Sequence, residues 1–232
     1  MARLPRLAAA GQLHQVVQRG NNGEAIFLDD EDCATYLRML REAATASRVA
    51  IHGYALTGCH AHLVATPDDA LGLSRMMQAL GRRYVGRFNR RHGRTGTLWE
   101  GRFRATVLEA KSYLLACLCF VELAPVREGL VRRPQDHPWS SAAHHLGLRI
   151  DPLVTDHPGY WGLGNTPFER EAAHAEILER ALTSTELLQI SQATMKGWAL
   201  GSAPFLAGLE KQTARRVVVG TRGRPAKARK SA

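Results

Sequence analysis

The first 148 residues predict an α+β fold in which helices cover one face of an antiparallel sheet. Two observations support this prediction. Short segments with strand-like patterns lie at 13–19, 49–56 and 60–66, and longer segments with hydrophobic residues every three or four positions begin near 30, 73 and 111. The order is strand, helix, strand, strand, with only Gly58 and Cys59 between the last two strands, which favours an antiparallel hairpin.

The boundaries of the first elements follow from turn and capping residues. The strand at 13–19 ends at Gly20-Asn21-Asn22-Gly23, a sequence typical of a turn. Asp29 or Asp30 then supplies the N-cap of a helix that should end near Ser47. The hairpin strands at 49–56 and 60–66 come next.

A second long helix is predicted from about residue 73 to Gly93. Its apolar face carries Leu73, Met76, Leu80, Tyr84 and Phe88. A further strand is predicted within 97–108, and a helix over 111–126 that Pro125 and Gly129 close. These elements complete the domain expected over residues 1–148.

The rest of the chain predicts a linker at 149–166, a helical segment at 167–211 and a basic tail at 212–232. Thr183 and Glu186 form a capping-box pattern, Gly197 is suited to end that helix, and Ser202 can cap the next. Two short capped helices around a turn resemble a helix-turn-helix. The alternative is a small helical bundle that packs on the main domain.

Composition and charge limit the function classes. The 232 residues are 45% hydrophobic with a formal net charge of +10, which excludes a wholly disordered chain. No apolar run approaches the ~20 residues of a membrane span, so no membrane partner is expected. The N-terminus lacks the pattern of a secretory signal, and a cytoplasmic location is predicted. The four cysteines do not have the spacing of a paired metal site.

Two basic regions indicate a polyanionic partner, with nucleic acid favoured. Residues 81–104 contain eight arginines and one acid, with aromatic residues between them. Many of these arginines fall off the apolar helix face, where they could follow phosphates; a solvated helix face is the alternative reading. The candidate DNA-binding residues in this region are Arg82, Arg83, Arg87, Arg90, Arg91, Arg94 and Arg102.

The second basic region is the tail. Arg222-Gly223-Arg224-Pro225 resembles an AT-hook, whose arginines enter the narrow minor groove of A·T-rich duplex DNA. Arg222 and Arg224 are therefore further candidate DNA-binding residues. A basic tail that binds phosphates without sequence preference is the alternative.

His60-Ala61-His62 lies on a predicted strand. Because side chains alternate along a strand, both imidazoles should lie on one face, as two ligands of one divalent metal require. A pair of polar surface histidines is the alternative reading of this short pattern.

Several motifs occur together in order along the chain. They are Gly20-Asn21-Asn22, Tyr54-Ala55-Leu56 before the two histidines, Phe88-Asn89-Arg90-Arg91-His92, Leu98-Trp99-Glu100-Gly101-Arg102-Phe103, Val121 to Arg127, and Trp139-Ser140-Ser141. This set resembles the single-tyrosine HUH (IS200-like) transposases, in particular the REP-associated tyrosine transposase group, over residues 1–148.

The resemblance implies a ferredoxin-like sheet that carries His60 and His62 as ligands of Mg²⁺ or Mn²⁺. The implied partner is single-stranded or hairpin DNA, and a homodimer is a further expectation. In the family, a tyrosine on a later helix attacks a phosphate of the DNA and forms a 5′-phosphotyrosine link. The metal stabilises charge on the phosphoryl oxygens.

This chain departs from the family pattern at the tyrosine. The matched position is Phe120, which has no hydroxyl, and the amide residue expected four positions later is Ala124. The resulting prediction is a DNA-binding protein with impaired nicking and rejoining. The alternative is an active transposase that uses Tyr113 or a metal-bound water, with Glu122 as a further candidate ligand. An unrelated metal hydrolase is a third class.

Overall fold

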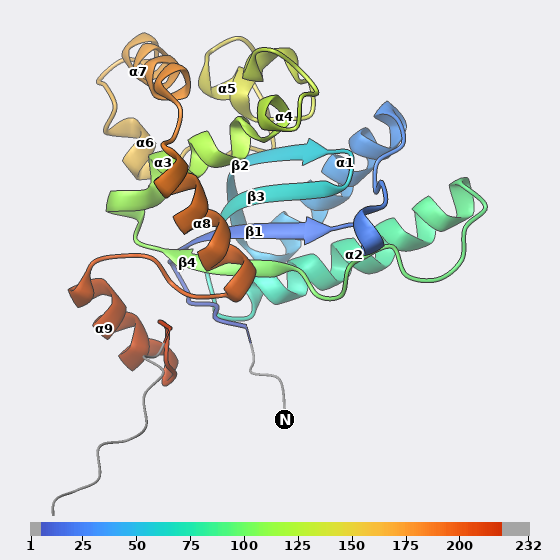
Figure 1. Ribbon diagram of the computed structural model, residues 1–232, viewed down its shortest axis with the longest axis horizontal. Helices are drawn as coiled ribbons and strands as arrows, with labels where there is room; N and C mark the ends of the chain where they lie inside the picture. Colours follow the sequence, from blue (N-terminus) through green and yellow to red (C-terminus); the bar gives the residue numbers. More distant parts are fainter. Residues whose placement is uncertain (1–5, 220–232) are drawn as a thin grey trace, which may run out of the picture.

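The computed structural model describes residues 6–219 and confirms the α+β class, with a four-stranded antiparallel sheet of spatial order β2-β3-β1-β4 (Figure 1). The strands are β1 (Leu13–Arg19), β2 (Val49–Thr57), β3 (His60–Pro67) and β4 (Arg104–Leu108). The helices are α1 (Asp30–Ser47), α2 (Gly72–Arg91), α3 (Ala110–Glu122), α4 (Ala124–Arg127), α5 (Ala142–His145), α6 (Pro158–Trp161), α7 (Pro167–Arg180), α8 (Ser184–Lys196) and α9 (Ala203–Thr213), with 3-10 turns at Asn21–Gly23 and Pro134–Asp136.

The two long helices α1 and α2 cover one face of the sheet, as predicted (Figure 1). Asp29 is the N-cap of α1 and accepts a hydrogen bond from the backbone N–H of Asp32. Tyr36 of α1 and Tyr84 of α2 meet edge to face, with ring centroids 5.1 Å apart. Both rings are fully buried, so the apolar stripes of these helices form one hydrophobic core with the sheet.

The opposite face of the sheet is covered by α3 and α8 (Figure 1). On β3, Leu63 packs with the α1 and α2 side, while Val64 packs with α3 and α8. Because side chains alternate along a strand, His62 lies on the same face as Val64. The register of β3 therefore directs the histidine pair towards α3.

Two predicted elements are shorter than expected. The strand predicted within 97–108 forms only at 104–108, because the preceding loop contains Gly101 in the left-handed region with φ of 66° and makes only an isolated bridge to Gly20. The helix predicted over 111–126 ends at Glu122, and α4 follows after Leu123. Pro125 has no N–H to continue the ladder of α3, which explains the break.

The segments after residue 148 lie against the sheet and α3. In the predicted linker, Val154 forms a bridge to Ile51 of β2, and Asp151 accepts a hydrogen bond of 2.6 Å from the hydroxyl of Tyr54. The capping box at Thr183 is present, and α8 ends at Gly197 with φ of 72°, as predicted. The apolar side of α8 packs on the sheet, where Ile190 is buried.

Candidate functional site

His60 and His62 lie side by side at the start of β3. Their ring centroids are 5.6 Å apart and the ring planes are inclined by 34°. The His60 side chain is partly open to solvent, whereas His62 is only 8% exposed. Strand geometry alone explains this arrangement, because residues two apart share a face.

His62 has the properties of a ligand that lacks a partner. Its Nδ1 atom is buried and has no hydrogen-bond partner within residues 6–219. Burial, with smaller contributions from His60 and Arg127, lowers the pKa of His62 to about 3. The imidazole is therefore neutral at physiological pH, which is the form that binds a metal ion.

A carboxylate lies beside His60. The distance from Glu128 Oε1 to His60 Nδ1 is 3.6 Å, and the Thr57 hydroxyl donates a hydrogen bond of 3.1 Å to the same oxygen. Burial opposes ionisation of Glu128, but the nearby His60 and the hydrogen bond from Thr57 lower its pKa below the usual value. Ligand atoms of Cys59, His60 and Glu128 all lie within 4.8 Å of one another.

Sequence reasoning missed Glu128, although it lies four residues after Ala124. Its position depends on the break after Glu122, because the short α4 turns the chain back over β2. A regular helix from 111 onward would have placed residue 128 elsewhere. Cys59 is a weaker candidate ligand, since burial raises the pKa of its thiol and keeps it protonated.

Phe120 of α3 lies against the histidine pair. The centroids of the Phe120 and His62 rings are 6.3 Å apart, in an edge-to-face arrangement. The guanidinium carbon of Arg127 lies 4.5 Å from the centroid of the Phe120 ring, and Arg127 donates a hydrogen bond of 2.5 Å to the Phe120 carbonyl. The residue at the matched tyrosine position thus packs beside His62 and offers no oxygen.

Tyr113 lies on the same helix but has a different neighbour. Its hydroxyl accepts a hydrogen bond of 3.1 Å from the side-chain amide of Gln189 on α8. Seven residues of helix separate Tyr113 from Phe120, which corresponds to about 10 Å along the axis. The structure therefore directs the Tyr113 hydroxyl to α8, away from the ring that contacts His62.

Glu122 faces another part of the protein. It is fully buried and accepts hydrogen bonds from His145 Nδ1 at 2.5 Å, Ser141 Oγ at 2.6 Å and His174 Nε2 at 2.7 Å. These partners come from the α5 region and α7. Glu122 is therefore taken up by a buried cluster that joins α3 to α7, and the idea that it completes a metal site with His60 and His62 is wrong.

Most of the candidate arginines on α2 are paired with acids. The packing of α1 against α2 places Arg83 beside Glu42 at 2.6 Å and Arg87 beside Glu31 at 2.7 Å. Arg91 contacts Asp29, Glu31 and Asp32, and Arg94 contacts Glu24. Arg82, Arg90 and Arg102 have no ion pair within the described part of the chain. Fewer of the candidate arginines are therefore without an acidic partner than the sequence indicated.

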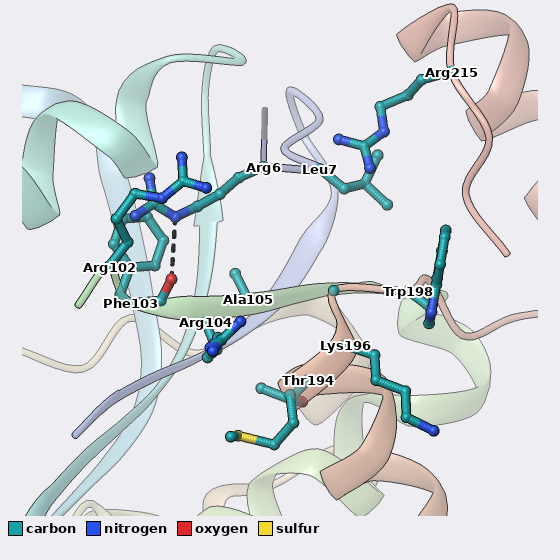
Figure 2. Close-up of a pocket in the computed structure, with 12 residues that line it drawn as sticks. Arg6, Leu7, Arg102, Phe103, Arg104, Ala105, Thr194, Lys196, Trp198 and Arg215 are labelled. Atoms are coloured by element: carbon teal, nitrogen blue, oxygen red, sulfur yellow. Dashed lines mark hydrogen bonds between the residues drawn. The ribbon is translucent and has the colours of Figure 1, made fainter. Parts of the chain in front are cut away.

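Two adjoining hollows lie beside the start of β4, the larger between α2 and the loop that precedes this strand, and we call them together the β4-edge groove. Their volumes are about 250 Å³ and 780 Å³, and both are lined by Arg6, Arg102 and Phe103. Figure 2 shows that the smaller hollow is built from the N-terminal segment, β4, the end of α8 and the segment after α9. Its cationic lining residues are Arg6, Arg102, Arg104, Lys196 and Arg215.

The remaining sequence predictions concern other parts of the chain. Arg222 and Arg224 of the AT-hook-like tail lie outside residues 6–219. Within that range, no helix combines the length and apolar character needed to cross a bilayer.

The chain shares its fold with a solved REP-associated tyrosine transposase, whose structure contains a bound REP hairpin. The TM-score is 0.52 at 18% identity, and the match covers 68% of this chain and 96% of that chain. A candidate transposase from Deinococcus radiodurans R1 matches with a TM-score of 0.37 and 16% identity, covering 49% of this chain and 91% of that chain. No family model matches the sequence. No curated protein matches it either.

Proposed function

We propose that this protein binds single-stranded or hairpin DNA and lacks the tyrosine-dependent cleavage that its resemblance to REP-associated tyrosine transposases implies. The observation that carries the proposal is the contact between Phe120 and His62. A phenyl ring cannot attack a phosphate, because it has neither a hydroxyl oxygen nor a proton to lose. The basic surface required for binding does not depend on that hydroxyl.

The residues around His60 fit a divalent ion, because ligand atoms of His60 and Glu128 lie within 4.8 Å of each other and His62 is the neighbouring imidazole. The buried and unpartnered Nδ1 of His62 is a donor atom that needs a partner, and His60 lies beside it. We propose that Glu128 supplies the oxygen ligand that the methyl group of Ala124 cannot provide. Two imidazoles and a carboxylate are a suitable donor set for Mn²⁺ or Mg²⁺. A bound ion would attract phosphate oxygens and offset their charge.

The residues around the histidine pair explain how the protein could bind DNA without cleaving it. His62 stays neutral, so it does not repel a cation. Arg127 stacks on Phe120 and adds positive charge next to the histidines, which favours a phosphodiester at this position. Phe120 closes the place from which an attacking oxygen would approach. DNA can be held there, but no covalent bond to the protein forms.

The test uses a labelled hairpin oligonucleotide with a single-stranded extension, with Mn²⁺ or Mg²⁺ present. We expect binding by fluorescence anisotropy and no protein–DNA adduct on a denaturing gel. The double variant Phe120→Tyr/Ala124→Asn should form an adduct, because it restores the oxygen beside His62. Phe168→Tyr is the matched control, since Phe168 is 81% exposed on α7.

Other outcomes would contradict the proposal. An adduct formed by the unmodified protein that disappears in Tyr113→Phe would establish Tyr113 as a nucleophile. Cleavage without an adduct would establish a metal-activated water. Absence of binding to any DNA would remove the proposed function itself.

A further inference from the structure

We infer that the β4-edge groove is a binding track for single-stranded DNA, formed jointly by the sheet domain and the C-terminal segment. The inference rests on the proposed DNA-binding function and adds a site and a ligand form to it. It concerns residues distant in sequence that the fold brings together. Several of them, including Arg104, Lys196 and Trp198, were not among the residues predicted to bind DNA.

The smaller hollow of the groove exists because the segment after α8 pairs with the edge of β4. The backbone N–H of Leu200 donates to the Val107 carbonyl at 2.9 Å, and the N–H of Glu109 donates to the Leu200 carbonyl at 2.8 Å. The Thr106 hydroxyl donates to the carbonyl of Trp198. These bonds fix Lys196 and Trp198 beside the strand that carries Arg104, so both sides of the smaller hollow are held by backbone hydrogen bonds.

The charge of the groove is of one sign. Its cationic lining residues are Arg6, Arg82, Arg102, Arg104, Lys196 and Arg215, and neither hollow is lined by an acid. Within residues 6–219, Arg82, Arg102, Arg104 and Lys196 have no acid at ion-pair distance. The arginines on the other side of α2 are paired with α1. The groove therefore brings together four cations without an acid at ion-pair distance, as a phosphate-binding track requires.

Aromatic side chains line the same groove. The Arg6 guanidinium lies 3.7 Å from the centroid of the Phe103 ring and donates a hydrogen bond to the Phe103 carbonyl, as drawn in Figure 2. Trp99 and Trp198 are partly exposed, and Trp99 stacks on Tyr84 with ring planes 22° apart. Cations alternating with partly exposed aromatic rings are typical of single-strand binding, where bases stack and phosphates pair with arginine.

The size and position of the groove favour an unpaired strand. The larger hollow, about 780 Å³, lies within the ~300–1,000 Å³ range of small-ligand pockets, which suits one or two unpaired nucleotides rather than a duplex. The loop carrying Trp99 starts beside Gly20, at the end of β1 where Arg19 is the register partner of His60. The larger hollow lies on the α2 face of the sheet, and the histidine pair lies on the α3 face, so the two sites would contact different parts of a bound strand.

The test compares two triple variants of equal charge change. Arg102→Ala/Arg104→Ala/Lys196→Ala removes cations from the groove. Arg38→Ala/Arg75→Ala/Arg133→Ala removes three exposed arginines that are each paired with an acid elsewhere. Both are made in the full chain, and their melting temperatures are measured to verify folding. Affinity is measured by anisotropy from 50 to 300 mM NaCl for a dT oligonucleotide and for a blunt hairpin without unpaired ends.

We expect the groove variant to bind the dT oligonucleotide at least about tenfold more weakly near 0.1 M salt. The slope of log K against log salt should become less steep by about 2, since each lost phosphate contact in single-stranded DNA changes it by about 0.7. The control triple variant should keep the slope of the unmodified protein. Binding to the blunt hairpin should change much less than binding to the dT oligonucleotide.

The failures of the two proposals are distinguishable. If the groove variant keeps the affinity and salt slope for dT while the hairpin still binds, the groove is not a single-strand track, although the DNA-binding function stands. Equal losses for dT and the blunt hairpin would also overturn the single-strand assignment. If the unmodified protein binds neither DNA, the proposed function fails and the inference fails with it.

Discussion

Glu122→Gln should destabilise the protein strongly, even though residue 122 is fully buried and faces away from the histidine pair. The carboxylate is fully buried and is paired with His145 and His174, while Ser141 donates a third hydrogen bond. An amide keeps the size but removes the charge and one acceptor oxygen. Removing one partner of a buried pair costs about 3–5 kcal/mol. For a domain of this size that corresponds to about 6–20 °C in melting temperature.

The pH dependence of the difference between Glu122→Gln and the unmodified protein is a second readout. Burial alone would raise the pKa of Glu122, but His145 and His174 lower it, so its contribution is present above its ordinary pKa of 4.5 and declines in acid. Burial alone would lower the pKa of His145, but Glu122 raises it, so its contribution is full below 6.5 and declines as the pH rises through the folded-state pKa. The difference should therefore be largest between pH 4.5 and 6.5.

Urea unfolding of the two proteins across that pH range measures the effect. The matched control is Glu176→Gln, an exposed residue of α7 with no ion pair within residues 6–219, which should change stability by no more than about 0.5 kcal/mol. A Glu122→Gln protein within 1 kcal/mol of the unmodified chain at every pH would refute the reasoning. In that case the cluster would contribute nothing net to the free energy of unfolding.

Three further predictions follow from the structure. Glu128→Ala should weaken Mn²⁺ binding by at least about tenfold in calorimetry without loss of fold; unchanged affinity would exclude Glu128 as a ligand. Burial lowers the pKa of His14 and of His52 to about 4, so stability should fall as the pH decreases from 6.5 towards 4, and a flat melting-temperature profile there would contradict this. Gly53→Ala should cost about 1–3 kcal/mol in urea unfolding, because its Cβ would lie 2.6 Å from Leu118 Cδ2; unchanged stability would mean that α3 shifts freely.

Local patterns were sufficient for the main elements of the fold. The hairpin of β2 and β3, the N-cap of α1 at Asp29 and the end of α8 at Gly197 each depend on residues close together in sequence. The predicted bounds of two elements differ from the structure, because a contact distant in sequence or a local backbone conformation determines where each element begins or ends. The loop at 97–103 is drawn to the end of β1 by the bridge between Trp99 and Gly20, and composition alone could not separate this from a strand.

The candidate site was predicted in part from the sequence. Strand periodicity placed His60 and His62 together, and the motif order placed Phe120 near them. The pairing of Arg83 with Glu42, 41 residues away, could not be read from the charge of α2 alone. Glu128 was missed because its position depends on the break between α3 and α4. Sequence pattern alone could not predict the role of residues, such as Glu128, whose position depends on tertiary packing.

The C-terminal segment connects the two parts of the proposed function. His174 of α7 binds Glu122, two residues after Phe120 on α3, so the helix that faces the histidine pair is held in place by the segment after residue 166. The same segment pairs with β4 at Leu200 and contributes Lys196 to the groove. A fragment ending at residue 148 would lack Tyr160 and Ile190, which belong to the same buried cluster as Leu13 and Leu108. The domain boundary at residue 148 therefore stays a prediction. The hydrophobic core on the α3 face and the groove both include residues that follow this boundary.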